Sequence, residues 1–199
     1  MAKNYGVQVY GYDLSENMIK IANDLRNEQP SGIKHRVNFY VEDATLMDYP
    51  DQFYDMVYSR DTILHIDDKK ALFKSFYDTL KPGGKVVISD YCHGNKTKRS
   101  EQFEAYRKSR GYNLCTVEEY GKILESVGFV NVKAENLTSY FIEILKEEVL
   151  DFSQRRQKVV QEFSEKDYDY IVTGWNDKIK RCADNDQNWG YFVGKKPYA

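Results

Sequence analysis

The sequence is poor in proline and cysteine and contains no long apolar run. Of 199 residues, 4 are Pro, 12 are Gly and 41% are apolar, which excludes collagen-like, disordered and coiled-coil chains. No stretch of about 20 apolar residues is present, so we expect no transmembrane helix. The first residues, Met1–Gly6, also lack the apolar stretch of a signal peptide. We therefore expect a soluble, cytoplasmic protein.

Cysteine is too scarce for a disulfide framework. The three cysteines, Cys92, Cys115 and Cys182, are odd in number and far apart, and none follows another at the spacing of metal ligands. Free thiols in a reducing compartment are the simplest interpretation. We expect no metal site.

The sequence also has no excess of positively or negatively charged residues. The 29 Lys and Arg residues nearly balance the 31 Asp and Glu residues, and the formal net charge is -2. Such a chain has no broad basic surface for nucleic acid or anionic membranes, and we expect neither as a partner. Affinity for a small anion must come from a local site. We also expect a monomer.

Tyrosine, by contrast, is abundant, with 17 residues. A tyrosine side chain is apolar along its ring and forms hydrogen bonds at its tip, so the excess suggests a polar pocket with aromatic walls. The alternative is that many of these rings simply pack in the core.

Strand-like and helix-like patterns alternate in the first half of the chain. Ser15 begins a helix whose apolar residues recur until Pro30, and a second helix shows its inner face at Leu72, Phe73, Phe76 and Leu80 before a Lys-Pro-Gly-Gly turn. Strands followed by helices in this way predict an α/β fold with a parallel sheet. The predicted strands are Gly6–Asp13, Val37–Val41, Tyr54–Arg60 and Lys85–Tyr91.

Charged residues follow these strands where each one ends. Ligands of parallel sheets bind outside the carboxyl ends of the strands, so these residues mark a candidate site. They are Asp13, Asp43, Arg60 with Asp61, and Asp90 with Tyr91.

The second half is mostly helical. Thr116 and Glu119 form a capping box that predicts a helix start. The other predicted elements are a polar helix at 100–110, a strand at 131–137, charged helices at 139–188 and a last strand at 189–195.

Several motifs in a fixed order add a resemblance to this pattern. They are Leu80-Lys-Pro-Gly-Gly84, Tyr58-Ser-Arg-Asp-Thr-Ile-Leu-His65, Ser89-Asp-Tyr-Cys92, Thr116-Val-Glu-Glu-Tyr120, Gly174-Trp175 with Lys178, and Trp189-Gly-Tyr-Phe192. With acids ending the strands at Asp13 and Asp43, the set resembles the phosphoethanolamine N-methyltransferases. These belong to the class I S-adenosylmethionine-dependent methyltransferases and methylate phosphoethanolamine toward phosphocholine.

The resemblance covers essentially the whole chain. It implies a Rossmann-like sheet with helices on both faces, a helical insertion before the last strand, and one methyltransferase domain at 1–199 whose region at about 138–187 covers the substrate. S-adenosyl-L-methionine is the implied cofactor and a phosphobase the implied small-molecule partner. It also implies that the first strand and its Gly-rich turn, about 20 residues before the strand-ending acid, are missing, because 12 residues precede Asp13.

The resemblance assigns cofactor contacts to five residues. Asp13 is expected to accept both ribose hydroxyls, since a carboxylate offers two acceptor oxygens to a vicinal diol. Leu14 would pack on the adenine, and Asp43 with the Ala44 backbone would bind its amine and a ring nitrogen. Arg60 either lines the cofactor pocket or forms a surface ion pair. Helix capping and an ordinary strand exit are the alternatives for the acids.

Catalysis is assigned to His65 and Asp61. The substrate ammonium must lose a proton before its nitrogen attacks a methyl group, and histidine has a suitable pKa for that base. Asp61 is expected to hold the cationic amine by charge, and its alternative role is to cap the helix that follows.

The substrate phosphate is assigned to hydroxyls and cations of the second half. The resemblance implies that Tyr91, Tyr106, Arg110, Tyr112 and Lys178 bind the phosphobase. Arginine can contact two phosphate oxygens at once, and lysine adds a point charge. Core tyrosines and solvated cations are the alternative. Trp175 and Trp189 are expected to be core anchors without a chemical role.

Two further functions are compatible with the sequence. The missing Gly-rich turn suggests an inactive methyltransferase-like fragment that acts at most as a binding module. A methyltransferase of another small amine is the other alternative.

Overall fold

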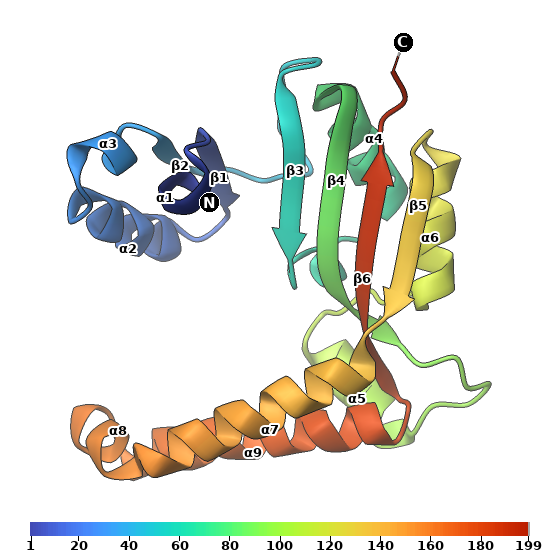
Figure 1. Cartoon of the computed structure of the whole chain (residues 1–199). Helices are drawn as coiled ribbons and strands as arrows, with labels where there is room; N and C mark the ends of the chain where they lie inside the picture. The colour runs from blue at the N-terminus through green and yellow to red at the C-terminus, as the bar shows by residue number, and fades with distance from the viewer. Residues whose placement is uncertain (199) are drawn as a thin grey trace. The chain divides into compact units, whose positions relative to one another are not determined.

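The computed structural model describes residues 1–198 and divides into two compact units, Met1–Pro50 and the chain from Asp51 onward. The first unit is a small α/β element (blue in Figure 1), in which two parallel strands pair from Val9 with Val37 to Asp13 with Val41. Its elements are α1 (Ala2–Tyr5), β1 (Val9–Asp13), α2 (Glu16–Asn27), α3 (Ser31–Lys34) and β2 (Val37–Val41).

The helix start at Ser15 is confirmed, because its hydroxyl accepts a hydrogen bond from the backbone N–H of Met18. Strand β1 is shorter than the predicted Gly6–Asp13. Gly6 has a φ of 65° and ends helix α1 in the left-handed conformation, so the chain becomes extended only after it.

The second unit contains a four-stranded sheet in the order β3-β4-β6-β5. Figure 1 shows helices α4 and α6 behind the sheet, and α7 and α9 side by side beyond one end of it. The elements are β3 (Tyr54–Arg60), the 3-10 helix η1 (Ile63–His65), α4 (Lys69–Thr79), β4 (Leu80–His93), α5 (Glu101–Ser109), α6 (Val117–Ser126), β5 (Val130–Asn136), α7 (Thr138–Gln154), α8 (Arg156–Glu162), α9 (Glu165–Ala183) and β6 (Gln187–Lys195).

The predicted parallel pairing is confirmed for the strands of the first half, since β1 pairs parallel with β2 and β3 with β4, and the last strand adds an antiparallel element. β3 and β4 run parallel, but β6 is antiparallel to both β4 and β5. The chain leaves β5 through α7 and returns through the neighbouring helix α9, so it re-enters the sheet at the end where it left. There the backbone N–H of Leu137 donates to the carbonyl of Trp189. A helical pair of this kind reverses the chain, whereas a single crossover helix restores the strand direction.

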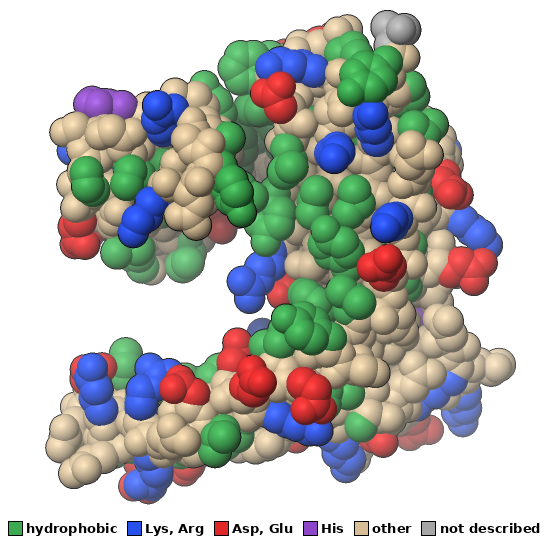
Figure 2. Space-filling view, viewed as in Figure 1, with side chains coloured by type: hydrophobic (Ala, Val, Ile, Leu, Met, Phe, Trp, Pro, Cys, Tyr) green, Lys and Arg blue, Asp and Glu red, His purple; other side chains and the backbone are tan. Residues whose placement is uncertain are grey.

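One face of the sheet forms the core with α4 and α6. Phe73 of α4, Tyr120 of α6 and Phe192 of β6 are completely buried, and the rings of Tyr120 and Phe192 stack with centroids 4.0 Å apart. Full burial of such rings contributes about 2–3 kcal/mol each. On the opposite face, Figure 2 shows hydrophobic side chains gathered over β3 and β4, where Met56 and Tyr58 are about half exposed.

Two local sequence signals are confirmed in the second unit. The capping box of α6 is complete, because the Thr116 hydroxyl accepts from the N–H of Glu119 while the Glu119 carboxylate accepts from the N–H of Thr116. Helix α4 ends at Thr79, just before the Lys-Pro-Gly-Gly turn, where the pairing of β4 with β3 shifts register. Gly83 has a φ of 80° there, which favours glycine.

Among residues 1–198, no helix has both the length and the apolar character needed to cross a membrane.

Candidate functional site

Asp61 follows the carboxyl end of β3, as predicted. Its backbone has a φ of 49°, a left-handed conformation that Asp tolerates better than most residues, and its N–H donates to the carbonyl of Ser89 at 2.8 Å. The indole Nε1–H of Trp189 donates to Oδ1 of Asp61 at 2.9 Å, and the Arg60 side chain lies 3.9 Å from Oδ2. Asp61 thus makes a tertiary contact.

The alternative role of Asp61 as a helix cap is not realised. Thr62 is the N-cap of η1, and helix α4 is capped by Asp68, whose carboxylate accepts from the N–H of Ala71. Burial raises the pKa of Asp61, while the hydrogen bond from Trp189 and the charges of Arg60 and Lys178 oppose this rise. The group is therefore a partly desolvated carboxylate with cations around it.

His65 lies in η1, four positions after Asp61, and its side chain is exposed. Its ring meets the ring of Tyr112 edge to face, with centroids 5.1 Å apart. The predicted base and one predicted phosphate ligand are therefore neighbours. An exposed imidazole beside aromatic rings can exchange protons with water and with a bound amine.

Tyr91 and Lys178 bring the end of β4 and helix α9 together. Nζ of Lys178 donates to the hydroxyl oxygen of Tyr91 at 2.8 Å and lies 5.0 Å from its ring centroid. The same ammonium is 5.8 Å from the ring centroid of Phe141 in α7. Burial lowers the pKa of Lys178 and raises that of Tyr91. This lysine is thus a partly desolvated cation among aromatic rings.

The other three predicted phosphate ligands come from α5 and the loop that follows it. The ring centroids of Tyr106 and Tyr112 are 5.8 Å apart, and those of Tyr91 and Tyr112 are 6.3 Å apart. Nε of Arg110 donates to the Tyr112 hydroxyl at 3.4 Å, and the rest of its side chain is exposed. The five predicted phosphobase residues are therefore linked by direct contacts, with Tyr112 at their centre.

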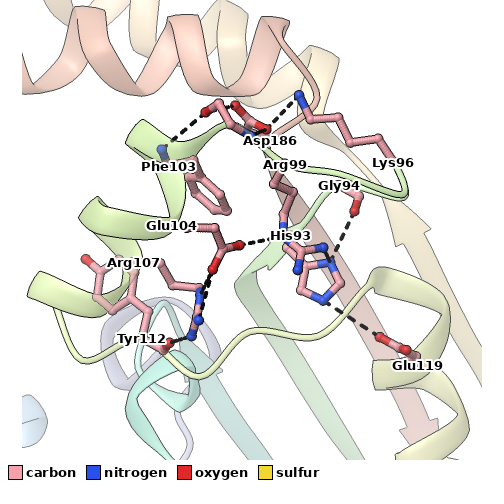
Figure 3. Close-up of polar contacts among 11 residues, drawn as sticks. His93, Gly94, Lys96, Arg99, Phe103, Glu104, Arg107, Tyr112, Glu119 and Asp186 are labelled. Carbon is pink, nitrogen blue, oxygen red and sulfur yellow. Dashed lines mark hydrogen bonds and ion pairs between the residues drawn. The ribbon is translucent and has the colours of Figure 1, made fainter.

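A charged network holds α5 and this loop in place (Figure 3). Glu104 accepts hydrogen bonds from Arg99 at 2.7 Å and from Arg107 at 3.0 and 3.1 Å, and Arg107 also donates to the backbone carbonyl of Tyr112 at 2.9 Å. The hydrogen bond from Arg99 is the largest cause of the lowered pKa of Glu104. The network fixes the backbone from which Tyr112 projects.

Asp90 lies on the other side of β4 and is completely buried. Its carboxylate accepts from the backbone N–H of Tyr91 at 2.9 Å and from the hydroxyl of Tyr120 at 3.2 Å. Burial raises the pKa of Asp90 to about 7, against the opposing charge of Lys69. Asp90 therefore supports the strand end that presents Tyr91.

The predicted cofactor residues of the first unit lie at the carboxyl ends of β1 and β2. Oδ1 of Asp13 accepts from the backbone N–H of Ser15 at 2.8 Å. Asp43 accepts from the N–H and the hydroxyl of Thr45, and the hydroxyl contact is the main cause of its lowered pKa. Leu14 is 69% exposed, and Ala44 is half-buried. Two carboxylates and an exposed apolar side chain thus mark this edge.

Arg60, the fifth predicted cofactor residue, belongs to the second unit. Its side chain is 70% exposed and forms the ion pair with Asp61 described above. This contact corresponds to the surface ion-pair alternative, and a cofactor role for Arg60 stays a prediction.

Three residues to which the sequence assigns no role in the site also contact it. Trp189 packs in the core as predicted, but it also donates to Asp61. Phe141 stacks on Trp189 with centroids 5.0 Å apart, and the guanidinium of Arg181 lies 3.9 Å from the Tyr106 ring centroid. Arg181 follows Lys178 by three positions on a predicted helix, and this spacing predicts that the two side chains share one face of the helix.

All three cysteines are free thiols. Within residues 1–198, no group of three or more His, Cys, Asp or Glu side chains is arranged to hold a metal ion.

Comparisons with known proteins identify the family of the chain. A family described as "Methyltransferase domain" matches residues 1–88. The chain is 49% identical over 196 residues to a phosphoethanolamine N-methyltransferase of Triticum aestivum, covering 98% of this chain and 38% of the relative. It therefore spans less than half the length of that plant relative.

Two further relatives extend the comparison. A Plasmodium falciparum phosphoethanolamine N-methyltransferase is 35% identical, with 98% of this chain and 72% of the relative covered. The structure of a Haemonchus contortus phosphoethanolamine N-methyltransferase 2, in complex with phosphomonomethylethanolamine and S-adenosylhomocysteine, matches with a TM-score of 0.93 and 38% identity, over 98% of this chain and 45% of that one. The α/β class I methyltransferase fold is thereby confirmed, and the chain belongs to the phosphoethanolamine N-methyltransferase family.

Proposed function

We propose that the chain catalyses the S-adenosylmethionine-dependent N-methylation of phosphoethanolamine, of its mono- and dimethyl forms, or of both, toward phosphocholine. One observation carries the proposal. The carboxylate of Asp61, the imidazole of His65 and the Tyr112-centred group with Arg110 and Lys178 occupy one region of the second unit. A phosphobase has an ammonium group at one end and a phosphate at the other, and this region offers the complement of both.

At the phosphate end, Arg110 and Lys178 supply positive charge. The exposed guanidinium of Arg110 has donors to spare for two phosphate oxygens, and Lys178 adds a charge whose partial burial strengthens its field. The hydroxyls of Tyr91, Tyr106 and Tyr112 add hydrogen bonds. When the phosphate is bound here, the amine end of the substrate is expected to face Asp61 and His65.

At the amine end, Asp61 and His65 divide two tasks. The carboxylate of Asp61 attracts the substrate ammonium, and His65 takes one of its protons, which frees the nitrogen lone pair. S-adenosylmethionine, when bound, supplies an electrophilic methyl group and leaves as the neutral thioether S-adenosylhomocysteine. A new N–C bond forms as the S–C bond breaks. His65 then returns the proton to water, because its side chain is exposed.

The residues of the first unit fit the nucleoside part of this cofactor. Only Oδ1 of Asp13 accepts the Ser15 N–H, so the carboxylate retains acceptor sites for a vicinal diol. The exposed side chain of Leu14 offers an apolar surface to an adenine face. Asp43 and the Ala44 backbone are assigned to the adenine edge, and Arg60 to the cofactor pocket.

Calorimetry tests the proposal. We expect the purified chain to bind S-adenosylhomocysteine with micromolar affinity and phosphoethanolamine more tightly than free ethanolamine. Arg110→Ala should weaken phosphoethanolamine binding by about tenfold or more, because a hydrogen bond to a charged group contributes about 1.5–3 kcal/mol. Lys108→Ala, an exposed cation near the end of α5 and two positions before Arg110, is the matched control.

Each contrary outcome has a distinct meaning. Absence of S-adenosylhomocysteine binding would favour the inactive binding module, and unchanged affinity in Arg110→Ala would remove the phosphate assignment. Preference for free ethanolamine would indicate a methyltransferase of another small amine.

We further propose that residues 1–199 act as one methyltransferase domain in which the region at about 138–187 covers the substrate. The alignment of the Plasmodium relative across both units supports this. The cytoplasmic location and the monomeric state stay predictions, and the free thiols of all three cysteines are consistent with the former.

A further inference from the structure

Trp189 connects the last strand of the sheet with the candidate catalytic carboxylate. Its indole Nε1–H lies 2.9 Å from Oδ1 of Asp61, although 128 positions separate the two residues. After burial, this hydrogen bond is the largest influence on the pKa of Asp61, and it acts to lower it. A purely apolar contact would neither donate a hydrogen bond to Asp61 nor lower its pKa. Trp189 is therefore more than a core anchor.

The indole is itself held from several sides. Its ring stacks on Phe141 at an interplanar angle of 14°, and its backbone N–H donates to the hydroxyl of Thr138 at 2.9 Å. Trp189 also pairs with Tyr91 in the ladder of β4 and β6, next to the strand end that carries the phosphobase ligand. A ring fixed in this way can impose a direction on the group that it contacts.

The backbone of Asp61 does not fix the direction of its carboxylate, so side-chain contacts to the carboxylate oxygens determine it. The residue follows the strand with a φ of 49°, and its N–H is already used by the Ser89 carbonyl. Arg60 lies 3.9 Å from Oδ2, a distance that attracts but gives no directional hydrogen bond. The indole therefore engages Oδ1 and leaves Oδ2 as the oxygen that can meet a ligand.

We propose that Trp189 is a positioning residue, which orients the carboxylate of Asp61 toward the substrate amine. The proposal rests on the proposed function, because the amine is the ligand that this carboxylate would meet. The charged and titratable groups that face Asp61 are Arg60, Lys178, Asp90 and Tyr91, and the replacement of Trp189 alters the chemical identity of none of them.

A first experiment needs no substrate. In the NMR spectrum, the Trp189 indole N–H resonance should shift as Asp61 titrates, and the shift should vanish in Asp61→Asn. The Trp175 indole, assigned through Trp175→Phe, serves as the internal control. In Trp189→Phe, the side-chain carboxyl carbon of Asp61 should titrate at a higher pH than in the unchanged chain. An indole resonance of Trp189 that ignores pH would overturn the proposal.

A second experiment separates positioning from packing. Trp189→Phe should raise the dissociation constant of phosphoethanolamine about tenfold, while that of ethyl phosphate, which carries the phosphate without the amine, should stay the same. Equal weakening of both ligands would indicate a purely structural role. Trp175→Phe makes the same substitution at a residue packed against the same apolar cluster and should change neither constant.

The outcomes also distinguish the two proposals. If the unchanged chain binds phosphoethanolamine and ethyl phosphate with equal dissociation constants, the amine assignment of the proposed function fails. The NMR titration still decides whether Trp189 contacts the titrating carboxylate of Asp61. If Trp189→Phe does not fold, the comparison of the unchanged chain with Asp61→Asn tests the contact from the other side.

Discussion

The Nζ atom of Lys178 lies 2.8 Å from the Tyr91 hydroxyl and 5.0 Å from the centre of the Tyr91 ring, although 87 positions separate the two residues. The lysine uses one of its three N–H donors on Tyr91 and keeps the others for a further acceptor. Its position among Tyr91 and Phe141 reduces competition from water. These properties suit a cation that binds phosphate.

Replacement of Lys178 by methionine, which keeps the length of the side chain and removes the charge, should raise the dissociation constant of phosphoethanolamine by about tenfold or more. Inorganic phosphate should lose affinity by a similar factor, since the cation acts on the phosphate end. Isothermal titration calorimetry measures both. Lys180→Met, an exposed position on the same helix, is the control, and equal affinity in the two variants would contradict the assignment.

Removal of the His65 imidazole should slow methyl transfer mainly near neutral pH. His65→Ala loses the group that accepts the ammonium proton, but at high pH the amine is already neutral and the deficit should shrink. The measurement is turnover as a function of pH, with His35→Ala in the first unit as the control. A deficit of the same size at every pH would exclude the role of general base.

The raised pKa of Asp90 should make the folding stability of the chain depend on pH. Its pKa is about 7 in the folded chain and 3.8 in the reference state, so between these values the folded chain retains a proton that the unfolded chain has released. Stability therefore decreases as the pH rises from about 4 to 7, and the loss is complete above 7. Its size is on the order of 4 kcal/mol.

Asp90→Asn removes this titration and keeps the shape of the side chain. The difference in unfolding free energy between the two proteins should change in favour of the variant between pH 4 and pH 8. Denaturant unfolding at several pH values gives this difference. The nearby groups Lys69, Asp61 and Tyr120 are present in both proteins, so a constant offset across the range would show that Asp90 does not titrate as described.

Replacement of the buried Lys69 should lower the folding stability of the chain, and this test needs no ligand. The side chain is 5% exposed, and Nζ donates to the carbonyls of Ile63 at 3.0 Å, Ile66 at 2.7 Å and Asn113 at 2.7 Å. Lys69→Met should destabilise the chain by about 3–5 kcal/mol, because buried carbonyls lose their donors. Lys70→Met, the exposed neighbour, should change stability by less than about 0.5 kcal/mol. Thermal unfolding of both variants provides the test.

Local signals in the sequence predicted much of the fold. β2 and β3 have the predicted bounds, and the caps at Ser15 and Thr116 mark real helix starts. These features depend on neighbouring residues, whose pattern is visible in the chain. The direction of β6 was not visible, because it depends on how α7 and α9 fold back on each other.

The candidate site was predictable only in part for the same reason. The positions of Asp13, Asp43 and Asp61 after strand ends follow from topology, whereas the roles of Arg110 and Lys178 came from the resemblance to a family. The contact between Trp189 and Asp61 spans 128 positions and carries no local pattern. A tryptophan in an apolar strand looks the same whether or not its N–H has a partner.

The sheet order β3-β4-β6-β5 has a consequence for synthesis on the ribosome. β6 lies between β4 and β5, yet it follows both in the chain. β5 forms its ladder with β6, so it leaves the ribosome before its partner exists and cannot join the sheet until Gln187–Lys195 has emerged. The same strand brings Trp189 to Asp61. A nascent chain arrested within α9 would therefore lack both the edge strand and the indole contact, so that contact reports that β6 has left the ribosome.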